Sequence, residues 1–450
     1  MKISPVILAA GQGTRMRSKH PKVLHPLLGK AMIWYSLEAA YQATQVPATI
    51  VIGHGAEAVK QVSGTETQYV VQERQLGTGH ALQQAAPLLK GKTDLVLVIP
   101  GDLPLLTGET LRKMVAAQLH HSGPITMLTA ISGDPRGFGR VVRDGKGSVL
   151  AVVEEAQATA EQLNIRELNV GAYCFTADWL WPALSQISLS RKGEYYLTDL
   201  VGIASACGLS VQPLELEDAS ESIGVNTRVH LAEAEAALQQ RINWQWMLAG
   251  VTLHSPETVT IEPEVTIGAD TVIWPNTHLR AGTQIGEDCE IGPNTLIENT
   301  RIGNRCKVFA SVLEHAVVED DVDIGPFGHL RKGAHLAQGV HMGNFGEIKS
   351  SYLGPGTKMG HFSYIGDASI GSDVNIGAGT ITCNYDGVRK NHTEIGDGVF
   401  LGSDTMLVAP VKLEKGVHTG AGAVVTKDLP ENSLAVGVPA RVIRILTESD

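Results

Sequence analysis

The second half of the chain carries an aliphatic residue at every sixth position. That step matches neither the 3.6-residue period of a helix nor the two-residue period of an ordinary strand. Six-residue repeats in which Gly, Asn or Asp follows the aliphatic residue are typical of a parallel β-helix, in which three repeats form one triangular turn of about eighteen residues. We expect the aliphatic side chains to point into the coil. They are Ile267, Ile273, Leu279, Ile285, Ile291 and Ile297, then Ile324, Leu330, Leu336, Met342 and Ile348, then Ile395, Leu401, Leu407 and Leu413.

Length and composition narrow the class of protein. The 450 residues suggest two or three domains. A net charge of −11 argues against a nucleic-acid partner, because binding a phosphate backbone needs a basic face. The five cysteines include no CxxC pair and fit reduced thiols better than a disulfide framework or a zinc site. The chain has no signal-like start and no apolar run of about eighteen residues, so we expect a soluble, cytoplasmic protein without a membrane partner.

The first half alternates short apolar runs with helical segments. Residues 6–8 form an apolar run that ends in a glycine loop, and residues 31–43 have helical character. Residues 49–52 and 94–99 read as further strands, the second of them continuously apolar. Strands without polar alternation, separated by helices, indicate a mostly parallel sheet covered on both faces. The sequence therefore predicts an α/β domain.

A long helix separates the two halves. Residues 227–249 contain no Gly or Pro and are rich in Ala, Leu, Glu and Gln, and Asn226 or Thr227 is a suitable cap. The helix is expected to end at Gly250, shortly before the six-residue repeat begins. We therefore predict an α/β domain at 1–226, a linker helix at 227–250 and a β-helix domain at 251–450.

The first apolar run leads into a loop with the residues of a phosphate site. Gly11 and Gly13 allow a tight turn that brings backbone amides close to an anion. The loop matches neither the dinucleotide fingerprint nor Walker A, and a plain strand-to-helix turn explains such glycines equally well. Asp102 ends the buried strand, and ligands of parallel sheets bind at that edge. A carboxylate there suits Mg²⁺, although an isolated carboxylate at such a place is more often a helix cap or a turn residue.

Together with further motifs, these features resemble the sugar-1-phosphate nucleotidyltransferases. With the β-helix included, nearly the whole chain resembles the bifunctional family that makes UDP-N-acetylglucosamine. That resemblance implies a Rossmann-like domain, a left-handed β-helix, UTP and acetyl-CoA as co-substrates, Mg²⁺ as cofactor and a homotrimer that shares acetyl sites between chains. The motifs are LAAGQGTRM at 8–16, Pro21-Lys22, QERQLGTGH at 72–80, PGD at 100–102, GFGR at 137–140 and GEYYLTD at 193–199.

The resemblance implies roles for the residues of the first site, where a sugar phosphate would attack the α-phosphorus of UTP and expel pyrophosphate. The uridine nucleotide would be held by Leu8, Ala9, Ala10, Gly11, Gln72, Gly77 and Thr78. Arg15 and Lys22 would bind the phosphates. The N-acetylglucosamine would be bound by Gly139, Glu154 and Asn169. Mg²⁺ would be bound by Asp102 and by Asn226, which also contacts the nucleotide sugar. Gln12 stands where many relatives carry Lys, which we expect to tune affinity without abolishing activity.

A second site is indicated where the repeat breaks, between residues 380 and 394. The polar excursion there contains TCNYDG and VRKNH, and insertions into such coils commonly lie on the functional face. His361 lies shortly before it, in GHFSY. Acylation of an amine needs a base that removes a proton near neutral pH, which suits histidine. An arbitrary member of the sixteen histidines would more often be a surface or packing residue.

For this second site the resemblance implies acetylation of glucosamine-1-phosphate, with His361 as general base. Arg331 and Lys349 would grip the sugar phosphate, and Tyr364 and Asn375 would orient the sugar. The acetyl-CoA contacts would come from Ala378, Asn384, Tyr385, Ser403, Ala421 and Arg441. The tail departs from the family pattern of a C-terminal Arg that binds the CoA phosphates, so Arg441 or Arg444 would substitute.

Two other functions fit the same domains. A nucleotidyltransferase of a single activity, such as one that makes ADP-glucose, would use the β-helix only for regulation. A non-catalytic assembly or exchange-factor subunit would be expected to lack the glycine loop or Asp102, and both are present. His361 with its neighbouring excursion favours two activities, which would supply a precursor of cell-wall peptidoglycan and polysaccharide.

Overall fold

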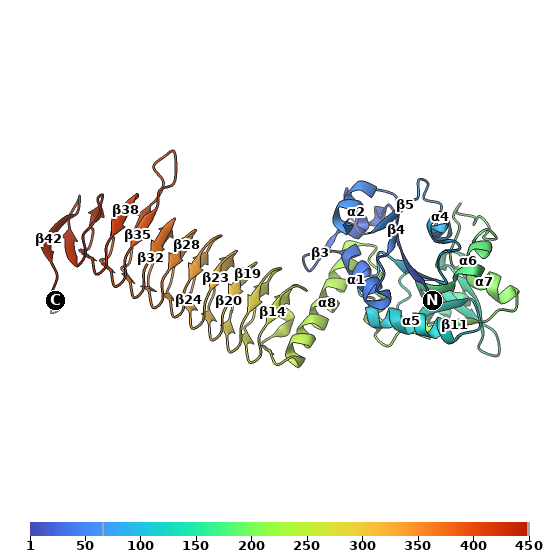
Figure 1. Cartoon of the computed structure of the whole chain (residues 1–450). Coiled ribbons are helices and arrows are strands. Elements are labelled where there is room, and N and C mark those ends of the chain that lie inside the picture. Colours follow the sequence, from blue (N-terminus) through green and yellow to red (C-terminus); the bar gives the residue numbers. More distant parts are fainter. Residues whose placement is uncertain (65–66, 448–450) are drawn as a thin grey trace. The chain divides into compact units, whose positions relative to one another are not determined.

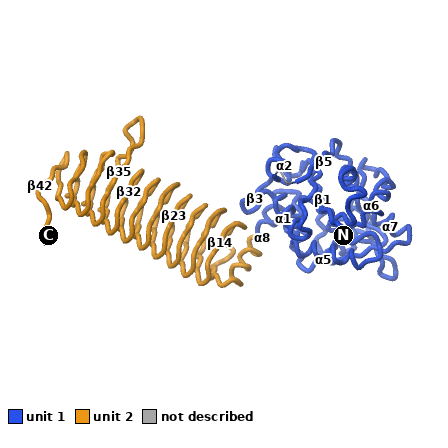
Figure 2. Tube along the Cα trace, in the orientation of Figure 1, with its two compact units in different colours: residues 1–238 blue, residues 239–450 orange. Residues whose placement is uncertain are grey.

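The computed structural model describes residues 1–64 and 67–447. The chain forms two compact units, Met1–Leu238 and Gln239–Asp450, drawn in different colours in Figure 2. Within the described residues, no helix has both the length and the apolar character needed to cross a membrane.

Unit 1 is built on a mixed sheet with the strand order β11-β7-β10-β6-β1-β4-β5. β6, β1, β4 and β5 are parallel, as predicted, but β10 runs antiparallel to both β6 and β7. A central antiparallel strand buried on both faces has the same continuous apolar sequence as a parallel one, so the sequence does not reveal its direction. The strands are β1 (Ile3–Ala9), β4 (Thr49–Ile52), β5 (Gln68–Val71), β6 (Leu95–Pro100), β7 (Ile125–Ile131), β10 (Glu167–Thr176) and β11 (Val211–Glu215), with β8 (Arg140–Arg143) paired to β10 and β9 (Val149–Val153) paired to β8.

Helices cover both faces of this sheet, which confirms the α/β prediction (Figure 1). Neighbouring residues of β1 alternate between two cores, Val6 in one and Ile7 in the other. The core around Ile7 includes residues of α1 and α5, and the core around Val6 includes residues of α3, α6 and α7. The helices are α1 (Met32–Thr44), α2 (Ala56–Ser63), α3 (Thr78–Gln83), α4 (Ala86–Leu89), α5 (Gly108–His120), α6 (Ala177–Leu184) and α7 (Asp199–Ala206).

The predicted long helix is present as α8 (Arg228–Leu248). Thr227 caps it, because its Oγ1 accepts a hydrogen bond from the backbone nitrogen of His230 at 3.2 Å. Near the other end, Asn243 donates to the carbonyl oxygens of Pro256 at 2.7 Å and Val259 at 3.0 Å. These bonds fasten the end of the helix to the first turn of the coil that follows.

Unit 2 is a parallel β-helix with three sheets, as the six-residue repeat predicts (Figure 1). Every aliphatic residue of the repeat is buried, with at most 8% of its surface exposed. Corner residues such as Asp270, Asn276 and Asp288 have positive φ angles, which Asn and Asp tolerate better than most residues. The Asn and Asp residues that follow the aliphatic positions therefore make the corners.

In each sheet, a strand pairs with the strand three further along the chain, except at the end of the first sheet, where β39 pairs with β41 and β41 with β42. The first sheet contains β12 (Thr252–Leu253), β15 (Val272–Ile273), β18 (Glu290–Ile291), β21 (Lys307–Val308), β24 (Asp323–Ile324), β27 (His341–Met342), β30 (Lys358–Met359), β33 (Asn375–Ile376), β36 (Phe400–Leu401), β39 (His418–Thr419), β41 (Ser433–Val436) and the antiparallel β42 (Arg441–Ile445). The second contains β13 (Thr260–Ile261), β16 (His278–Leu279), β19 (Leu296–Glu298), β22 (Val312–Glu314), β25 (His329–Leu330), β28 (Gly346–Lys349), β31 (Ser363–Gly366), β34 (Ile381–Cys383), β37 (Met406–Val408) and β40 (Val424–Val425). The third contains β14 (Thr266–Ile267), β17 (Gln284–Ile285), β20 (Arg301–Ile302), β23 (Val317–Val318), β26 (His335–Leu336), β29 (Tyr352–Leu353), β32 (Ala368–Ile370), β35 (Thr393–Ile395) and β38 (Val411–Leu413).

Candidate active sites

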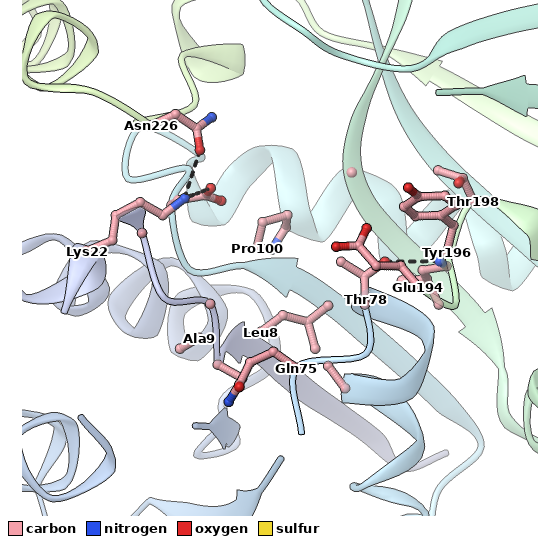
Figure 3. A pocket seen from close by; sticks show the side chains of 18 of the residues that line it. Leu8, Ala9, Lys22, Gln75, Thr78, Pro100, Glu194, Tyr196, Thr198 and Asn226 are labelled. Atoms are coloured by element: carbon pink, nitrogen blue, oxygen red, sulfur yellow. Dashed lines mark hydrogen bonds and ion pairs between the residues drawn. The ribbon is translucent and has the colours of Figure 1, made fainter. Parts of the chain in front are cut away.

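Unit 1 contains a cavity of about 690 Å³ at the carboxyl ends of β1, β5 and β6 (Figure 3). This is the edge of the sheet where α/β proteins bind ligands. The cavity brings together all the residues that the sequence analysis assigns to the nucleotide, the sugar and Mg²⁺, although they come from distant segments. They are Leu8, Ala9, Ala10, Gly11, Arg15, Lys22, Gln72, Gly77, Thr78, Asp102, Gly139, Glu154, Asn169 and Asn226.

The glycine loop after β1 is shaped by its two glycines in different ways. Gly13 has a φ of 65°, and a Cβ there would lie 2.6 Å from the Cβ of Lys22. Only glycine allows this approach, which brings Lys22 against the loop. A Cβ on Gly11 would meet no described atom within 4 Å, so the backbone at Gly11 is open to a ligand.

Lys22 connects the residues predicted to bind phosphate and metal. Its Nζ donates to Asp102 Oδ2 at 2.5 Å and to Asn226 Oδ1 at 3.0 Å, and Figure 3 shows Lys22 and Asn226 pointing toward each other. Arg15 Nη2 also donates to Asn226 Oδ1, at 2.9 Å. The oxygens of Asp102 and Asn226 thus already hold a cation between them, the ammonium group of Lys22.

The opposite end of the cavity presents groups suited to a sugar. Burial raises the pKa of Glu154, and Thr198 partly opposes that shift by donating to Glu154 Oε1 at 2.9 Å. Asn169 Oδ1 accepts from the hydroxyl of Tyr173 at 2.9 Å and from the backbone nitrogen of Gly171 at 3.3 Å. The amide nitrogen of Asn169 is therefore left to donate to a ligand, while Glu154 accepts.

The GEYYLTD segment has a role that the sequence analysis did not assign. The backbone nitrogen of Gly79 donates to the oxygen of Tyr195, and that of Tyr195 donates to Leu76, both at 2.8 Å. The backbone nitrogen of Leu197 donates to Thr78 Oγ1 at 3.0 Å. The segment therefore clamps the loop that carries Gly77 and Thr78, and only its motif in the sequence could have drawn attention to it.

In unit 2, four predicted residues share one corner of the coil, between the first and second sheets. Each lies one or two residues beyond a strand of the first sheet, and the strands belong to successive turns. Backbone bonds join the turns there, from Asp404 to the oxygen of Ala378 at 2.6 Å and from Gly422 to the oxygen of Ser403 at 2.8 Å. The four residues, in order along the corner, are His361, Ala378, Ser403 and Ala421. Asn375 lies on β33, just before Ala378.

At its other end, where it meets the third sheet, the second sheet presents a cluster of cations. Arg331 bonds through its backbone to Ile348, which places it one turn from Lys349, and Tyr364 lies on the next strand, β31. Lys390, and after it Arg331, lower the pKa of Lys349, because nearby positive charges disfavour its charged form. Lys390 was missed by the sequence analysis, although the VRKNH excursion that contains it was noted.

The excursion is a loop between β34 and β35 that projects from the stack (Figure 1). Asn384 is only 7% exposed, and its Nδ2 donates to Asp367 Oδ2 at 2.5 Å. Lys390 Nζ lies 3.8 Å from the same oxygen. Tyr385, in contrast, is 62% exposed. Asp367 thus anchors both ends of the loop and leaves Tyr385 at the surface.

Comparison with known proteins decides the family. Residues 5–197 match the model of the MobA-like NTP transferase domain. Residues 264–299 match the bacterial transferase hexapeptide and 393–427 the hexapeptide repeat of succinyl-transferase. The bifunctional protein GlmU of Heliobacterium modesticaldum is 48% identical over 97% of this chain and 95% of its own length. That of Pelobacter propionicus is 45% identical over 98% of this chain and 97% of its own. The chain belongs to the GlmU family.

Membership of the GlmU family makes this chain a bifunctional transferase with a nucleotide among its small-molecule substrates.

Arg441 is the predicted residue placed furthest along the coil. It lies on β42 opposite Val436, and its Nη1 donates to the oxygen of Ala440 at 3.0 Å. β41, which carries Val436, pairs with β39 just before Ala421, so Arg441 lies two strands beyond the strand that precedes the last of the other predicted acetyl-CoA residues. Its role in a GlmU-family enzyme stays a prediction.

Proposed function

We propose that the chain makes UDP-N-acetylglucosamine in two consecutive steps, as a cytoplasmic supplier of cell-wall precursors. Unit 2 transfers acetyl from acetyl-CoA to glucosamine-1-phosphate. Unit 1 then joins the product to UTP and releases pyrophosphate. We further propose that the first activity belongs to residues 251–450 and the second to residues 1–226, with 227–250 as the linker.

The uridylyl step is supported by the convergence of the assigned residues on one cavity. An oxygen of the sugar phosphate attacks the α-phosphorus of UTP, and the bond between the α- and β-phosphates breaks. This chemistry depends on positioning and charge neutralisation more than on a covalent nucleophile. Gly11 offers open backbone to the phosphates, Arg15 and Lys22 offer positive charge, and Asn169 and Glu154 hold the sugar.

Asp102 and Asn226 are the proposed Mg²⁺ ligands. Asp102 Oδ2 and Asn226 Oδ1 both accept from the ammonium group of Lys22, and this supports the proposal that the two residues can hold a cation. Mg²⁺ is commonly bound by one or two protein oxygens together with substrate phosphates, and it neutralises phosphate charge. When Asp102 and Asn226 hold a cation, the ammonium group of Lys22 would give up its hydrogen bonds to them and contact a phosphate instead.

The acetyl step is supported by the corner that carries His361 and by the cations at the other end of the short strands of the second sheet. Arg331 and Lys349 bind the sugar phosphate, and the closeness of Lys390 to Lys349 adds a third positive charge. His361 takes a proton from the amine as the amine attacks the thioester carbon. The carbon–sulfur bond then breaks, and coenzyme A leaves as the thiol.

We propose that the enzyme is a homotrimer whose acetyl sites combine residues from neighbouring chains. The hexapeptide coil supports this assignment, because it presents a long continuous side to other copies. His361 and Phe362 are exposed at the corner, with 56% of Phe362 accessible, and so are available to a neighbouring chain.

One coupled assay tests both activities. Wild type, Asp102→Ala and His361→Ala are supplied with acetyl-CoA, glucosamine-1-phosphate, UTP and Mg²⁺, and thiol and pyrophosphate are read separately. Pyrophosphate formation is also read with N-acetylglucosamine-1-phosphate supplied directly. When N-acetylglucosamine-1-phosphate is supplied, Asp102→Ala should lose only pyrophosphate formation, and His361→Ala should lose only thiol release. Wild type that forms pyrophosphate but never releases thiol would show that the β-helix is not an acetyltransferase.

A further inference from the structure

Gln72, which follows β5, has a side-chain amide with a fixed orientation. The residue is only 3% exposed. Its Nε2 donates to the carbonyl oxygen of Gly77 at 3.0 Å and lies 2.9 Å from Nδ1 of His80. A carbonyl oxygen only accepts hydrogen bonds, so the end of the amide that faces it must be the nitrogen. The same nitrogen lies within donating distance of His80 Nδ1, and we assign that ring nitrogen as the one without a proton, which accepts.

The other end of this amide is left for a ligand. Gln72 lines the cavity, and within the described residues its Oε1 accepts no hydrogen bond from the protein. An amide oxygen only accepts. At this part of its wall, the cavity therefore requires a ligand that brings a hydrogen-bond donor.

His80 is held in place by contacts that do not involve a ligand. It lies in the first turn of α3, and its ring stacks on Tyr195 with 6.4 Å between centroids and 29° between planes. Gln84, one helical turn further, donates from its Nε2 to the carbonyl oxygen of His80 at 3.0 Å, and the same nitrogen lies 3.2 Å from the opposite ring nitrogen. The backbone bond from Gly79 to Tyr195 fixes the start of the helix. Nδ1 is thus aimed at Gln72 by the fold itself.

We propose that His80 is a positioning residue that, together with the carbonyl oxygen of Gly77, fixes the Gln72 amide with its oxygen toward the cavity and thereby favours uracil over cytosine nucleotides. The inference rests on the proposed function, which places the nucleotide base at Gln72. Uracil carries an N–H at ring position N3, which donates to Oε1. Cytosine carries a lone pair there, which Oε1 repels. An amide free to turn over would present its nitrogen to cytosine and so would serve both bases.

The test compares wild type with His80→Phe and His80→Asn. Pyrophosphate release gives kcat and KM with UTP and with CTP, and equilibrium titration gives the affinity for each. His80→Phe keeps a ring beside Tyr195 but removes the acceptor. Because one neutral hydrogen bond contributes about 1 kcal/mol, the UTP:CTP ratio of kcat/KM should fall about fivefold to tenfold, through KM and not kcat. His80→Asn supplies an amide oxygen near the position of Nδ1 and should restore most of the ratio.

Gln84→Ala is the matched control, because it removes the contact to the opposite ring nitrogen and leaves Nδ1 and Gln72 unchanged; its ratio should stay within about twofold of wild type. Thermal unfolding and thiol release by unit 2 report whether each variant is folded. The inference is overturned if His80→Phe leaves the UTP:CTP ratio of kcat/KM unchanged. It is also overturned if the variant binds UTP and CTP more weakly by the same factor, as a structural defect would cause. Wild type that binds neither nucleotide would instead contradict the proposed function, and this inference with it.

Discussion

Single residues of the unit 1 cavity already balance one another's charges before any ligand arrives. Lys22 lies 2.5 Å from Asp102, and only 13% of its side chain and 27% of that of Asp102 are exposed. Lys22→Met leaves this carboxylate without its cation and removes a positive charge from the phosphates. We expect kcat/KM for pyrophosphate formation to fall about 10²–10³-fold, the usual effect of losing one group that stabilises transition-state charge.

Thiol release should be unaffected by Lys22→Met, because unit 2 carries its own residues for that step. A second measurement is Mn²⁺ binding without nucleotide, followed by electron paramagnetic resonance. Lys22→Met should bind Mn²⁺ more tightly than wild type, since the ammonium no longer occupies Asp102 and Asn226. Arg15→Gln removes a charge whose hydrogen bond, among the described residues, goes to Asn226, and it should change Mn²⁺ affinity less. Equal affinity in wild type and Lys22→Met would contradict this account.

Glu154 makes stability depend on pH. Burial, the larger influence, raises its pKa above the ordinary value of 4.5. A carboxyl whose folded-state pKa is raised contributes stability below its unfolded pKa and loses that contribution as pH rises through the folded value. Glu154→Gln cannot ionise, so its thermal midpoint should exceed that of wild type at pH 7.5 but not at pH 4. The same increase at both pH values would rule out ionisation as the cause.

The sequence could indicate the members of a candidate site where a motif contains them. It indicated them less well where the site depends on contacts between distant parts of the chain. The PGD motif pointed to Asp102, which lines the cavity, and the GHFSY motif pointed to His361, whose role stays a prediction. The sequence did not lead to Lys390, whose closeness to Lys349 depends on how a polar loop folds back, nor to Tyr195, which clamps a loop more than a hundred residues earlier. Contacts across such separations leave no periodic trace in the sequence.

At the scale of elements, the loop between β5 and α3 depends on one glycine. Gly77 has a φ of 96°, and a Cβ there would lie 2.6 Å from the oxygen of Tyr195. Gly77→Ala should therefore cost about 1–3 kcal/mol of local strain and raise the KM for UTP about tenfold, with a smaller change in kcat. Steady-state kinetics and thermal unfolding measure the two effects.

Gly145→Ala is a suitable control for Gly77→Ala, because a Cβ at Gly145 meets no described atom within 4 Å and its φ is not positive. It should leave both measurements unchanged. If Gly77→Ala also bound UTP normally, the clamp on this loop would not matter for the nucleotide.

Elements with a strong period were predictable, and elements defined only by burial were not. The six-residue step identified the strands of the β-helix, because each inward position must be aliphatic. The helix α8 followed from its composition and its cap at Thr227. The direction of β10 could not be predicted, because burial on both faces removes the alternation that distinguishes antiparallel strands at a surface.

At the scale of the whole molecule, the proposed trimer predicts a difference between the two activities. The cavity of unit 1 contains its complete set of assigned residues within one chain. If acetyl sites are completed by a neighbouring chain, dilution below the trimer dissociation constant should lower thiol release per chain and leave pyrophosphate formation unchanged. Sedimentation at the same concentrations identifies the oligomer. Thiol release that stays constant in a demonstrated monomer would contradict a shared site.

The pairing of each strand with its counterpart one turn later has a consequence for how the protein folds during synthesis. Thr252 pairs with Val272 and Phe400 with His418, so the partners of unit 2 are close in sequence, whereas in unit 1 Ile3 must find Leu95 and Val211 must find Ile125. Short separations speed folding, and stacked repeats grow by adding to their neighbours. Each turn of the β-helix can therefore pair with the preceding turn as it leaves the ribosome. Although the β-helix is built from strands, its contacts join residues that are close in sequence, as the contacts of helical proteins do.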